Sequence, residues 1–268
     1  MFLWLVVIVV VAYVVCLKCI YYRHRRSLKH GISALPSLGR HGVEIECLVV
    51  TAHPDDECMF FGPAIIRLIE CNVSVHVLCL SEGNYYNEGA QRKQELFNSC
   101  AKLGIPSSRI AILDHKKLPD DPKAEWKVSL VASIIAKHLR AGAFNMVLTF
   151  DGRGVSGHSN HVTIYKAVRH LASTDQLPND CRLFSLVTVG LLRKYVSFFE
   201  LPLSWLLPSS LCCIVGAKGY RQCKVSLEHT GCHALSSHST CLVSVSVHHL
   251  LALHVCQHIP DDSTRTKG

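Results

Sequence analysis

The sequence VEIECLVVTAHPDDE (residues 43–57) joins a run of apolar residues to a histidine and three acidic residues. Its apolar part is typical of a strand buried on both faces, as strands in parallel sheets are. Acidic groups this close together repel and raise one another's pKa values unless a positive group lies between them. The stretch therefore predicts a buried strand that ends at a charged site, and a metal ion is the obvious positive group.

Apolar strands and amphipathic helices alternate along the chain after this stretch. Strands are predicted over residues 43–53, 74–83, 109–114, 144–151 and 183–192, and helices over 56–71, 88–104, 126–142 and 159–174. Gly62-Pro63 predicts a kink or restart in the first helix, and Gly104 predicts a C-cap for the second. The alternation predicts an α/β, Rossmann-like fold: a mostly parallel sheet with helices on both faces.

Three polar loops follow strands of this predicted sheet: TAHPDDE (51–57), SEGNYYNEG (81–89) and DGRGVSGHSNH (151–161). Sites in such folds form beyond the carboxyl ends of the strands, where these loops converge. Two imidazoles and one carboxylate can hold a catalytic zinc and leave a position for water. A second carboxylate could act as general base, and a further histidine could stabilise an oxyanion.

Each motif also has a purely structural interpretation. Asp55 and Asp56 could cap the helix that follows them, and His53 could be a core histidine with satisfied hydrogen bonds. Glu57 is the least certain member of the motif, because its side chain could serve only to orient the loop or a ligand. Two such motifs at strand ends of one sheet, in this chain order, favour a functional site.

The first segment is a candidate membrane anchor. Residues 2–17 (FLWLVVIVVVAYVVCL) are apolar without a break, and a snorkelling Lys18 extends the span to about 20 residues, enough for a tilted transmembrane helix. A signal peptide is the alternative, but the segment lacks a basic n-region and a small-residue cleavage site. All nearby Lys and Arg residues follow the span, so we expect an anchor over 1–22, a basic linker over 23–42, and a cytosolic remainder.

The composition agrees with a folded domain beside a membrane. The chain has 268 residues, of which 49% are hydrophobic and 18% charged, so disorder is not expected. The formal charge of +8 indicates an anionic neighbour, and its placement after the apolar span favours lipid head groups over nucleic acid. The 14 cysteines fall at irregular spacings, which favours reduced thiols over a disulfide framework.

HPDDE (53–57), SEGNYYNEG (81–89) and GHSNH (157–161) resemble motifs of the PIG-L/LmbE family of zinc-dependent de-N-acetylases. The likeness runs roughly over residues 46–205, including LPDDP (118–122) and LLRKY (191–195), which gives a catalytic domain over 43–205. The resemblance implies the following roles: His53, Asp56 and His161 bind zinc or another divalent metal, Asp55 is the general base, and His158 polarises the carbonyl or stabilises the oxyanion. Asn160 stands where the family often has an aspartate.

The chain is most similar to the eukaryotic branch of that family. This implies hydrolysis of the N-acetyl group of N-acetylglucosaminyl-phosphatidylinositol, a glycolipid of GPI-anchor biosynthesis, by a single-pass protein of the endoplasmic reticulum membrane whose catalytic domain faces the cytosol. Arg92 is a candidate ligand of the inositol phosphate, with a solvated helix face as the alternative. A magnesium-dependent phosphohydrolase is a second hypothesis, but His53 and His161 disfavour it because magnesium prefers oxygen ligands.

The resemblance ends after Trp205, and residues 206–268 form an atypical tail rich in cysteine and histidine. Its two HxxxH pairs, His229 with His233 and His254 with His258, suggest a zinc module. A zinc finger also needs a closely spaced cysteine pair upstream, and the tail has no CxxC. We favour a replaced C-terminus without selected structure, which leaves an inactive or unstable variant of the deacetylase as an alternative.

Overall fold

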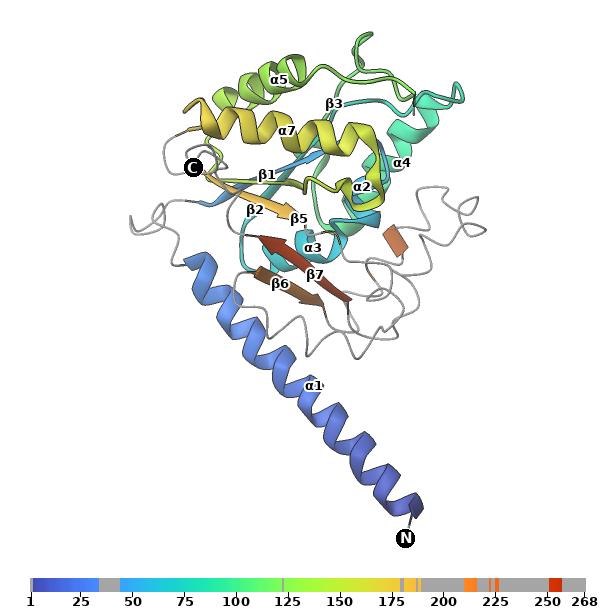
Figure 1. The fold of residues 1–268 in the computed structure, drawn as a ribbon, viewed down its shortest axis with the longest axis vertical. Helices are drawn as coiled ribbons and strands as arrows, with labels where there is room; N and C mark the ends of the chain where they lie inside the picture. Colours follow the sequence, from blue (N-terminus) through green and yellow to red (C-terminus); the bar gives the residue numbers. More distant parts are fainter. Residues whose placement is uncertain are drawn as a thin grey trace, which may run out of the picture.

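The computed structural model describes residues 2–33, 44–121, 123–178, 181–186, 188, 210–215, 222, 225–226 and 251–256. Its centre is one sheet in the order β3-β2-β1-β4-β5-β7-β6 (Figure 1). The five parallel strands are β1 Glu46–Thr51, β2 Ser74–Cys79, β3 Ile110–Ile112, β4 Met146–Phe150 and β5 Arg182–Leu186. The predicted parallel α/β sheet is therefore confirmed.

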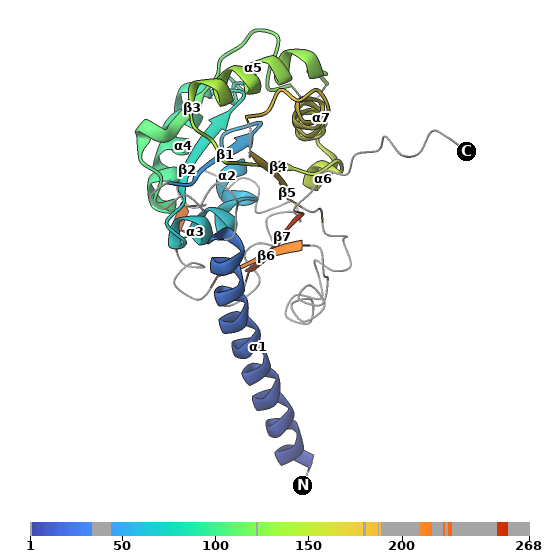
Figure 2. The ribbon, with the colours of Figure 1, turned by 90° about the vertical axis from the view of Figure 1, so that its left-hand side faces the viewer.

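Helices cover both faces of the sheet (Figures 1 and 2). One face carries α2 Asp56–Met59, α3 Gly62–Glu70 and α4 Gly89–Leu103, and the other carries α5 Val128–Ala141 and α7 Ser159–Ser173. Two short helical turns are η2 Ser107–Arg109 and α6 Gly154–Gly157. Each lies within a connection between longer elements.

The sequence pattern accounts for these elements. Cys47, Leu48, Val49 and Val50 of β1 have no exposed surface, because β1 pairs with strands on both sides and helices cover both its faces. Pro63 lies in the first turn of α3, which separates this helix from α2 as the predicted restart requires. The predicted cap also forms: Gly104 ends α4 with a φ of 97°, a left-handed conformation that favours glycine.

The N-terminal helix α1, Phe2–Ser33, extends away from the domain (Figure 1). Its segment Phe2–Arg23 is long and apolar enough to cross a membrane, by length and composition alone. Large apolar side chains along it are exposed, with Phe2, Leu3 and Trp4 more than 70% accessible. An amphipathic helix of a protein core would bury its apolar side chains. Their exposure here is what a helix surrounded by lipid would show.

Two strands of the tail join the sheet beyond β5. β7, Leu251–Cys256, pairs antiparallel with β5, and β6, Ser210–Val215, pairs antiparallel with β7. The tail histidines His229, His233 and His258 lie outside the described residues, so the two interpretations of the tail remain predictions.

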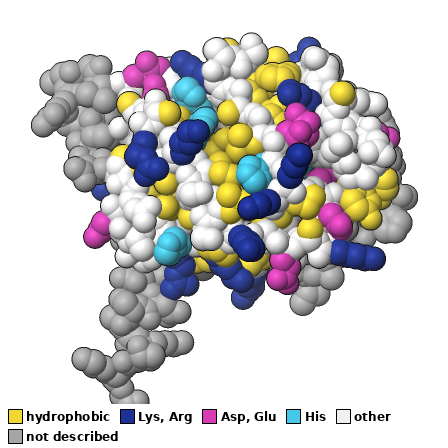
Figure 3. Space-filling model, turned by 90° about the horizontal axis from the view of Figure 1, so that it is seen from above, with side chains coloured by type: hydrophobic (Ala, Val, Ile, Leu, Met, Phe, Trp, Pro, Cys, Tyr) yellow, Lys and Arg dark blue, Asp and Glu magenta, His cyan; other side chains and the backbone are white. Residues whose placement is uncertain are grey.

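The face of the molecule that carries α5, seen from above, has charges of both signs (Figure 3). Lys and Arg side chains lie there among acidic, histidine and apolar ones rather than in one stripe. Below the surface, four cysteines of the sheet and its helices are buried, as predicted for most of them: Cys47, Cys58, Cys79 and Cys100.

Candidate metal and active site

The site lies beyond the carboxyl ends of β1 and β4, which are neighbours in the sheet. The chain leaves β1 toward α2 on one face and leaves β4 toward α7 on the other face. Such a divergence is a topological switch point, where open α/β sheets form their sites. It brings the loop that follows residue 51 to the loop that follows residue 150, as the sequence predicts.

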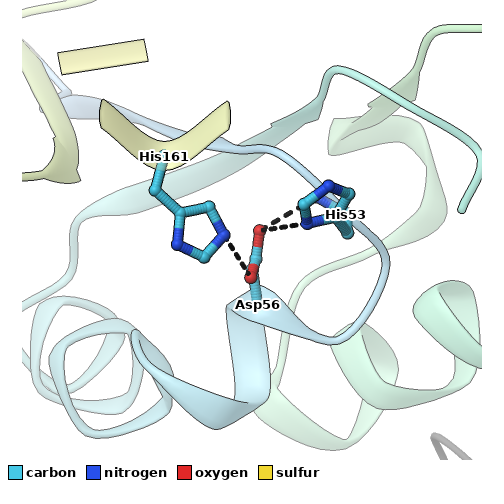
Figure 4. A group of neighbouring side chains, drawn as sticks. All are labelled: His53, Asp56 and His161. Atoms are coloured by element: carbon cyan, nitrogen blue, oxygen red, sulfur yellow. Dashed lines mark hydrogen bonds and ion pairs between the residues drawn. The ribbon is translucent and has the colours of Figure 1, made fainter. Parts of the chain in front are cut away.

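Three buried side chains form the centre of this site: His53, Asp56 and His161 (Figure 4). One potential ligand atom from each lies within 4.8 Å of the other two. Asp56 Oδ1 is 3.2 Å from His161 Nε2, and Asp56 Oδ2 is 3.9 Å from His53 Nδ1. Two imidazoles and one carboxylate are the donor set of a catalytic zinc site with an open position.

Backbone groups hold two of these side chains in place. Asp56 Oδ2 accepts hydrogen bonds from the backbone N–H groups of Ala52 and His53, both at 2.9 Å. His161 Nδ1 lies 3.0 Å from the Gly154 carbonyl oxygen, which can only accept, so Nδ1 carries the proton. The lone pair of a neutral His161 is therefore on Nε2, turned toward Asp56 (Figure 4).

The residues fit a metal ion. His161 Nε2 is buried and makes no hydrogen bond among the described residues, although it lies 3.2 Å from Asp56 Oδ1. A buried polar atom without a partner costs free energy, and a cation between His161 Nε2 and the Asp56 carboxylate would satisfy both groups. The second imidazole, His53, completes a nitrogen-rich set that suits zinc better than magnesium.

The charge states agree with this arrangement. Burial lowers the pKa of His53 to about 4, so its imidazole is neutral at pH 7, as a metal ligand must be. Burial opposes protonation of His161 as well, but the adjacent Asp56 carboxylate raises its pKa. The pKa of Asp56 is lowered by His161 and His53, although burial alone would raise it.

Asp55 lies next to this centre, and its carboxylate is held by Arg92. Asp55 Oδ2 is 2.9 Å from Arg92 Nη2, and the Asp55 side chain is 16% exposed. Burial, followed by the Asp56 charge, raises the pKa of Asp55, whereas Arg92 acts in the opposite direction. A carboxylate with a raised pKa is a better proton acceptor near neutral pH.

His158 and Asn160 complete the α7 side of the site. The His158 ring lies 4.8 Å from the His53 ring and 5.0 Å from the His161 ring, centroid to centroid. Burial, followed by the charge of His161, lowers the pKa of His158. Asn160 is fully buried, and its Nδ2 is 3.1 Å from His53 Nε2. Asn160 thus contacts a predicted ligand where the family often has an aspartate.

The structure brings all six predicted site residues together, and Arg92 has a place that its prediction did not foresee. Its guanidinium donates to the carbonyl oxygens of Pro54 (2.7 Å) and Gly83 (3.3 Å), besides its bond to Asp55. Arg92 Nη1 also lies 3.2 Å from Asp120 Oδ2. Arg92 therefore joins the loops that follow β1, β2 and β3, and contact with an inositol phosphate stays a prediction.

Asp120 is the site residue that the sequence interpretation left without a role. Its Oδ1 is 3.2 Å from His53 Nε2, so one carboxylate bridges His53 and Arg92. Asp120 also lines a cavity of 260 Å³ together with Tyr85 and Glu82. It lies in LPDDP, in the connection that follows β3, so the strand-end rule points to this connection but does not single out Asp120 or its partners.

The part of the chain that contains this site is similar to known proteins. Residues 48–172 match the PIG-L family model, described as GlcNAc-PI de-N-acetylase. The N-acetylglucosaminyl-phosphatidylinositol de-N-acetylase of Bos taurus is 48% identical over 160 residues, 60% of this chain and 63% of the bovine protein. A probable enzyme of that name from Schizosaccharomyces pombe is 35% identical over 167 residues, 61% of this chain and 66% of its own length. The chain thus spans slightly less than two thirds of these relatives.

Solved structures show the same fold at low identity. The zinc-inhibited form of a teicoplanin deacetylase has a TM-score of 0.55 at 12% identity, covering 81% of this chain and 100% of that one. A conserved protein of Thermus thermophilus has a TM-score of 0.55 at 16% identity, covering 82% of this chain and 99% of that one. The fold is thus one that a deacetylase adopts. Over residues 48–172 the chain is therefore similar to the PIG-L family of de-N-acetylases.

Proposed function

We propose that this protein is a membrane-anchored, zinc-dependent deacetylase. Its substrate would be N-acetylglucosaminyl-phosphatidylinositol, and its products glucosaminyl-phosphatidylinositol and acetate, in an early step of GPI-anchor biosynthesis. The observation that carries the proposal is the complete buried set of His53, Asp56 and His161, with Asp55 beside it, within the region that matches the family. The names of the bovine and yeast relatives support the choice of substrate.

His53, Asp56 and His161 would hold the zinc ion. When bound, zinc polarises the acetamide carbonyl and lowers the pKa of water, so that hydroxide is available near neutral pH. Two imidazoles and a single carboxylate leave part of the coordination sphere free for substrate. A magnesium-dependent phosphohydrolase is disfavoured by the same set, because magnesium favours oxygen ligands.

Asp55 and His158 would carry the proton and charge changes of amide hydrolysis. Asp55 accepts a proton from the attacking water, whose oxygen forms a bond to the acetamide carbon. His158 stabilises the negative charge that develops on the carbonyl oxygen. The carbon–nitrogen bond then breaks, the proton passes to the leaving amine, and acetate and the glucosamine amine are the products. Asp55 returns to its carboxylate form.

The apolar helix explains how such an enzyme would reach a lipid-linked substrate. Phe2–Arg23 would anchor the protein in the endoplasmic reticulum membrane, with the basic residues that follow on the cytosolic side. A tag at Gly268 should then be digested by protease when only the plasma membrane is permeabilised. Glycosylation at Asn72, which lies in an Asn-Val-Ser sequence, would contradict this topology.

The activity can be tested on the full chain purified in detergent micelles with zinc. Acetate release from N-acetylglucosaminyl-phosphatidylinositol would support the proposal if the Asp55→Asn variant, prepared in the same way, releases none. A folded, zinc-loaded wild-type chain without activity would favour the alternative of an inactive variant with a replaced C-terminus.

A further inference from the structure

Glu57 is a fully buried acid whose position the proposed reaction does not explain. It lies on α2, next to Asp56, yet it is not one of the grouped metal-ligating side chains. Its two carboxylate oxygens have separate partners. Oε2 accepts a hydrogen bond from the backbone N–H of Asp55 at 3.0 Å, and Oε1 accepts one from the hydroxyl of Ser99 on α4.

The residue that Glu57 contacts has an unusual backbone. Asp55 has a φ of 120° and a ψ of −27°, although it is not glycine. Side chains with a Cβ persist in this region only where their surroundings hold them there. The hydrogen bond from Asp55 N–H to Glu57 supplies part of that restraint, because the N–H group moves with φ of Asp55.

The same peptide group is held from its other end by Arg92. The carbonyl oxygen of Pro54 accepts a hydrogen bond from Arg92 Nη2 at 2.7 Å. Arg92 Nη2 also donates a hydrogen bond to Asp55 Oδ2 at 2.9 Å. The peptide between Pro54 and Asp55 is therefore fixed at its oxygen by α4 through Arg92. At its nitrogen it is fixed by α2 through Glu57.

We propose that Glu57 is a positioning residue for Asp55. It accepts the Asp55 N–H and so keeps the Asp55 carboxylate aimed at the site, while Ser99 fixes the Glu57 side chain against α4. Glu57 itself touches neither metal nor substrate in this role. The kinetic part of this inference rests on the proposed function, in which Asp55 takes the proton; the restraint on the Asp55 backbone does not.

In this role Glu57 must accept a hydrogen bond but need not carry a charge. Two variants of similar size distinguish these two properties. In Glu57→Gln, the amide oxygen can accept the Asp55 N–H, and the Ser99 hydroxyl can rotate to accept from the amide nitrogen. In Glu57→Leu, the side chain fills about the same space and accepts nothing. The full chain in detergent micelles should be measured for kcat, KM, zinc content and, in its zinc-free form, hydrogen exchange at the Asp55 amide.

We expect Glu57→Leu to lower kcat by about 10- to 100-fold at unchanged KM, the usual effect of a slightly misplaced catalytic group. Its zinc content should equal that of the wild type, and its Asp55 amide should exchange about tenfold faster or more. Glu57→Gln should remain within about threefold of the wild type in kcat and exchange. Hydrogen exchange tests whether Glu57 restrains the Asp55 backbone, even if the wild-type chain has no deacetylase activity.

Three results would overturn the inference. If Glu57→Gln is as slow as Glu57→Leu, the charge or proton of Glu57 is needed. If Glu57→Leu loses zinc together with activity, Glu57 supports the ligands instead. If Glu57→Leu matches the wild type in kcat and in hydrogen exchange, Glu57 does not position Asp55. Should Glu57→Leu fail to melt cooperatively, Ser99→Ala replaces it: we expect a several-fold lower kcat at unchanged KM, and wild-type values would overturn the inference.

Discussion

Replacing Asp120 by Asn should weaken zinc binding, although Asp120 is not one of the proposed ligands. Its carboxylate contacts two cationic or potentially cationic groups at once: His53 Nε2 and Arg92 Nη1, each at 3.2 Å. When the proton of a neutral His53 is on Nε2, both His53 and Arg92 donate to Asp120. An asparagine has a single acceptor oxygen, so its amide nitrogen must then face one of the two. Either the orientation of His53 or the position of Arg92 then loses its support.

The magnitude follows from the burial of the pair. The side chains of His53 and Asp120 are 9% and 13% exposed, so water replaces the lost hydrogen bond only in part. Removing a partner of this kind from a metal-binding histidine costs about 10- to 100-fold in metal affinity. Because asparagine keeps one acceptor, we expect the lower value, about tenfold, or about 1.4 kcal/mol.

Competition with a chromophoric chelator would measure the zinc dissociation constant of the purified full chain. Asp121→Asn is the matched control: Asp121 lines the same cavity, but its carboxylate accepts from the Lys123 backbone N–H at 2.8 Å. Unchanged zinc affinity in Asp120→Asn, or an equal loss in Asp121→Asn, would refute the argument that Asp120 orients His53.

Three further predictions concern the site acids and the tail. Zinc and turnover should both be lost in three alanine variants: His53→Ala, Asp56→Ala and His161→Ala. Asp55→Asn should keep zinc and lose turnover, because an amide cannot accept the proton. Metal analysis would measure the zinc content and a deacetylation assay the turnover, and equal zinc loss in all four variants would contradict this division. Burial raises the pKa of Glu57 from 4.5 to about 7, so the fold favours its protonated form. Without zinc, its contribution to the free energy of unfolding should be full below pH 4.5 and lost as the pH rises through 7, and Glu57→Gln should remove this slope in urea titrations. A chain that ends at Leu207 should bind as much zinc as the full chain, and both should melt low or aggregate; a cooperative full chain that loses zinc on truncation would make the tail structural.

The sequence predicted most of the fold because its strands are buried on both faces. Continuous apolar runs such as Cys47–Val50 admit few alternatives once helical periodicity flanks them. Strand ends were predicted less well: β1 ends at Thr51, two residues before the predicted end. The polar residues Thr51, the last residue of β1, and His53, a candidate metal ligand, are both buried. Burial by itself therefore does not mark the end of a strand.

The candidate ligands could be named from short motifs at two strand ends, whereas the residues that contact them could not. Asp120 lies 67 positions after His53, and Ser99 lies 42 positions after Glu57. Only the packing of α4 and of the connection after β3 against the β1 loop makes these pairs neighbours. The left-handed backbone of Asp55 has no sequence signal either, since glycine rather than aspartate is the usual residue there.

The crowding of Asp55, Asp56 and Glu57 at one strand end is possible because each acid has a different partner. Asp56 pairs with His161 of α7, Asp55 pairs with Arg92 of α4, and Glu57 bonds Ser99 of α4. Three consecutive carboxylates without such partners would repel one another in a buried place. Helices on both faces of the sheet must therefore be in position before the motif is stable. His161, Arg92 and Ser99, the three side-chain partners just named, all lie within residues 92–161 and outside β6 and β7. The charged centre can therefore form in a chain that spans less than two thirds of its bovine relative.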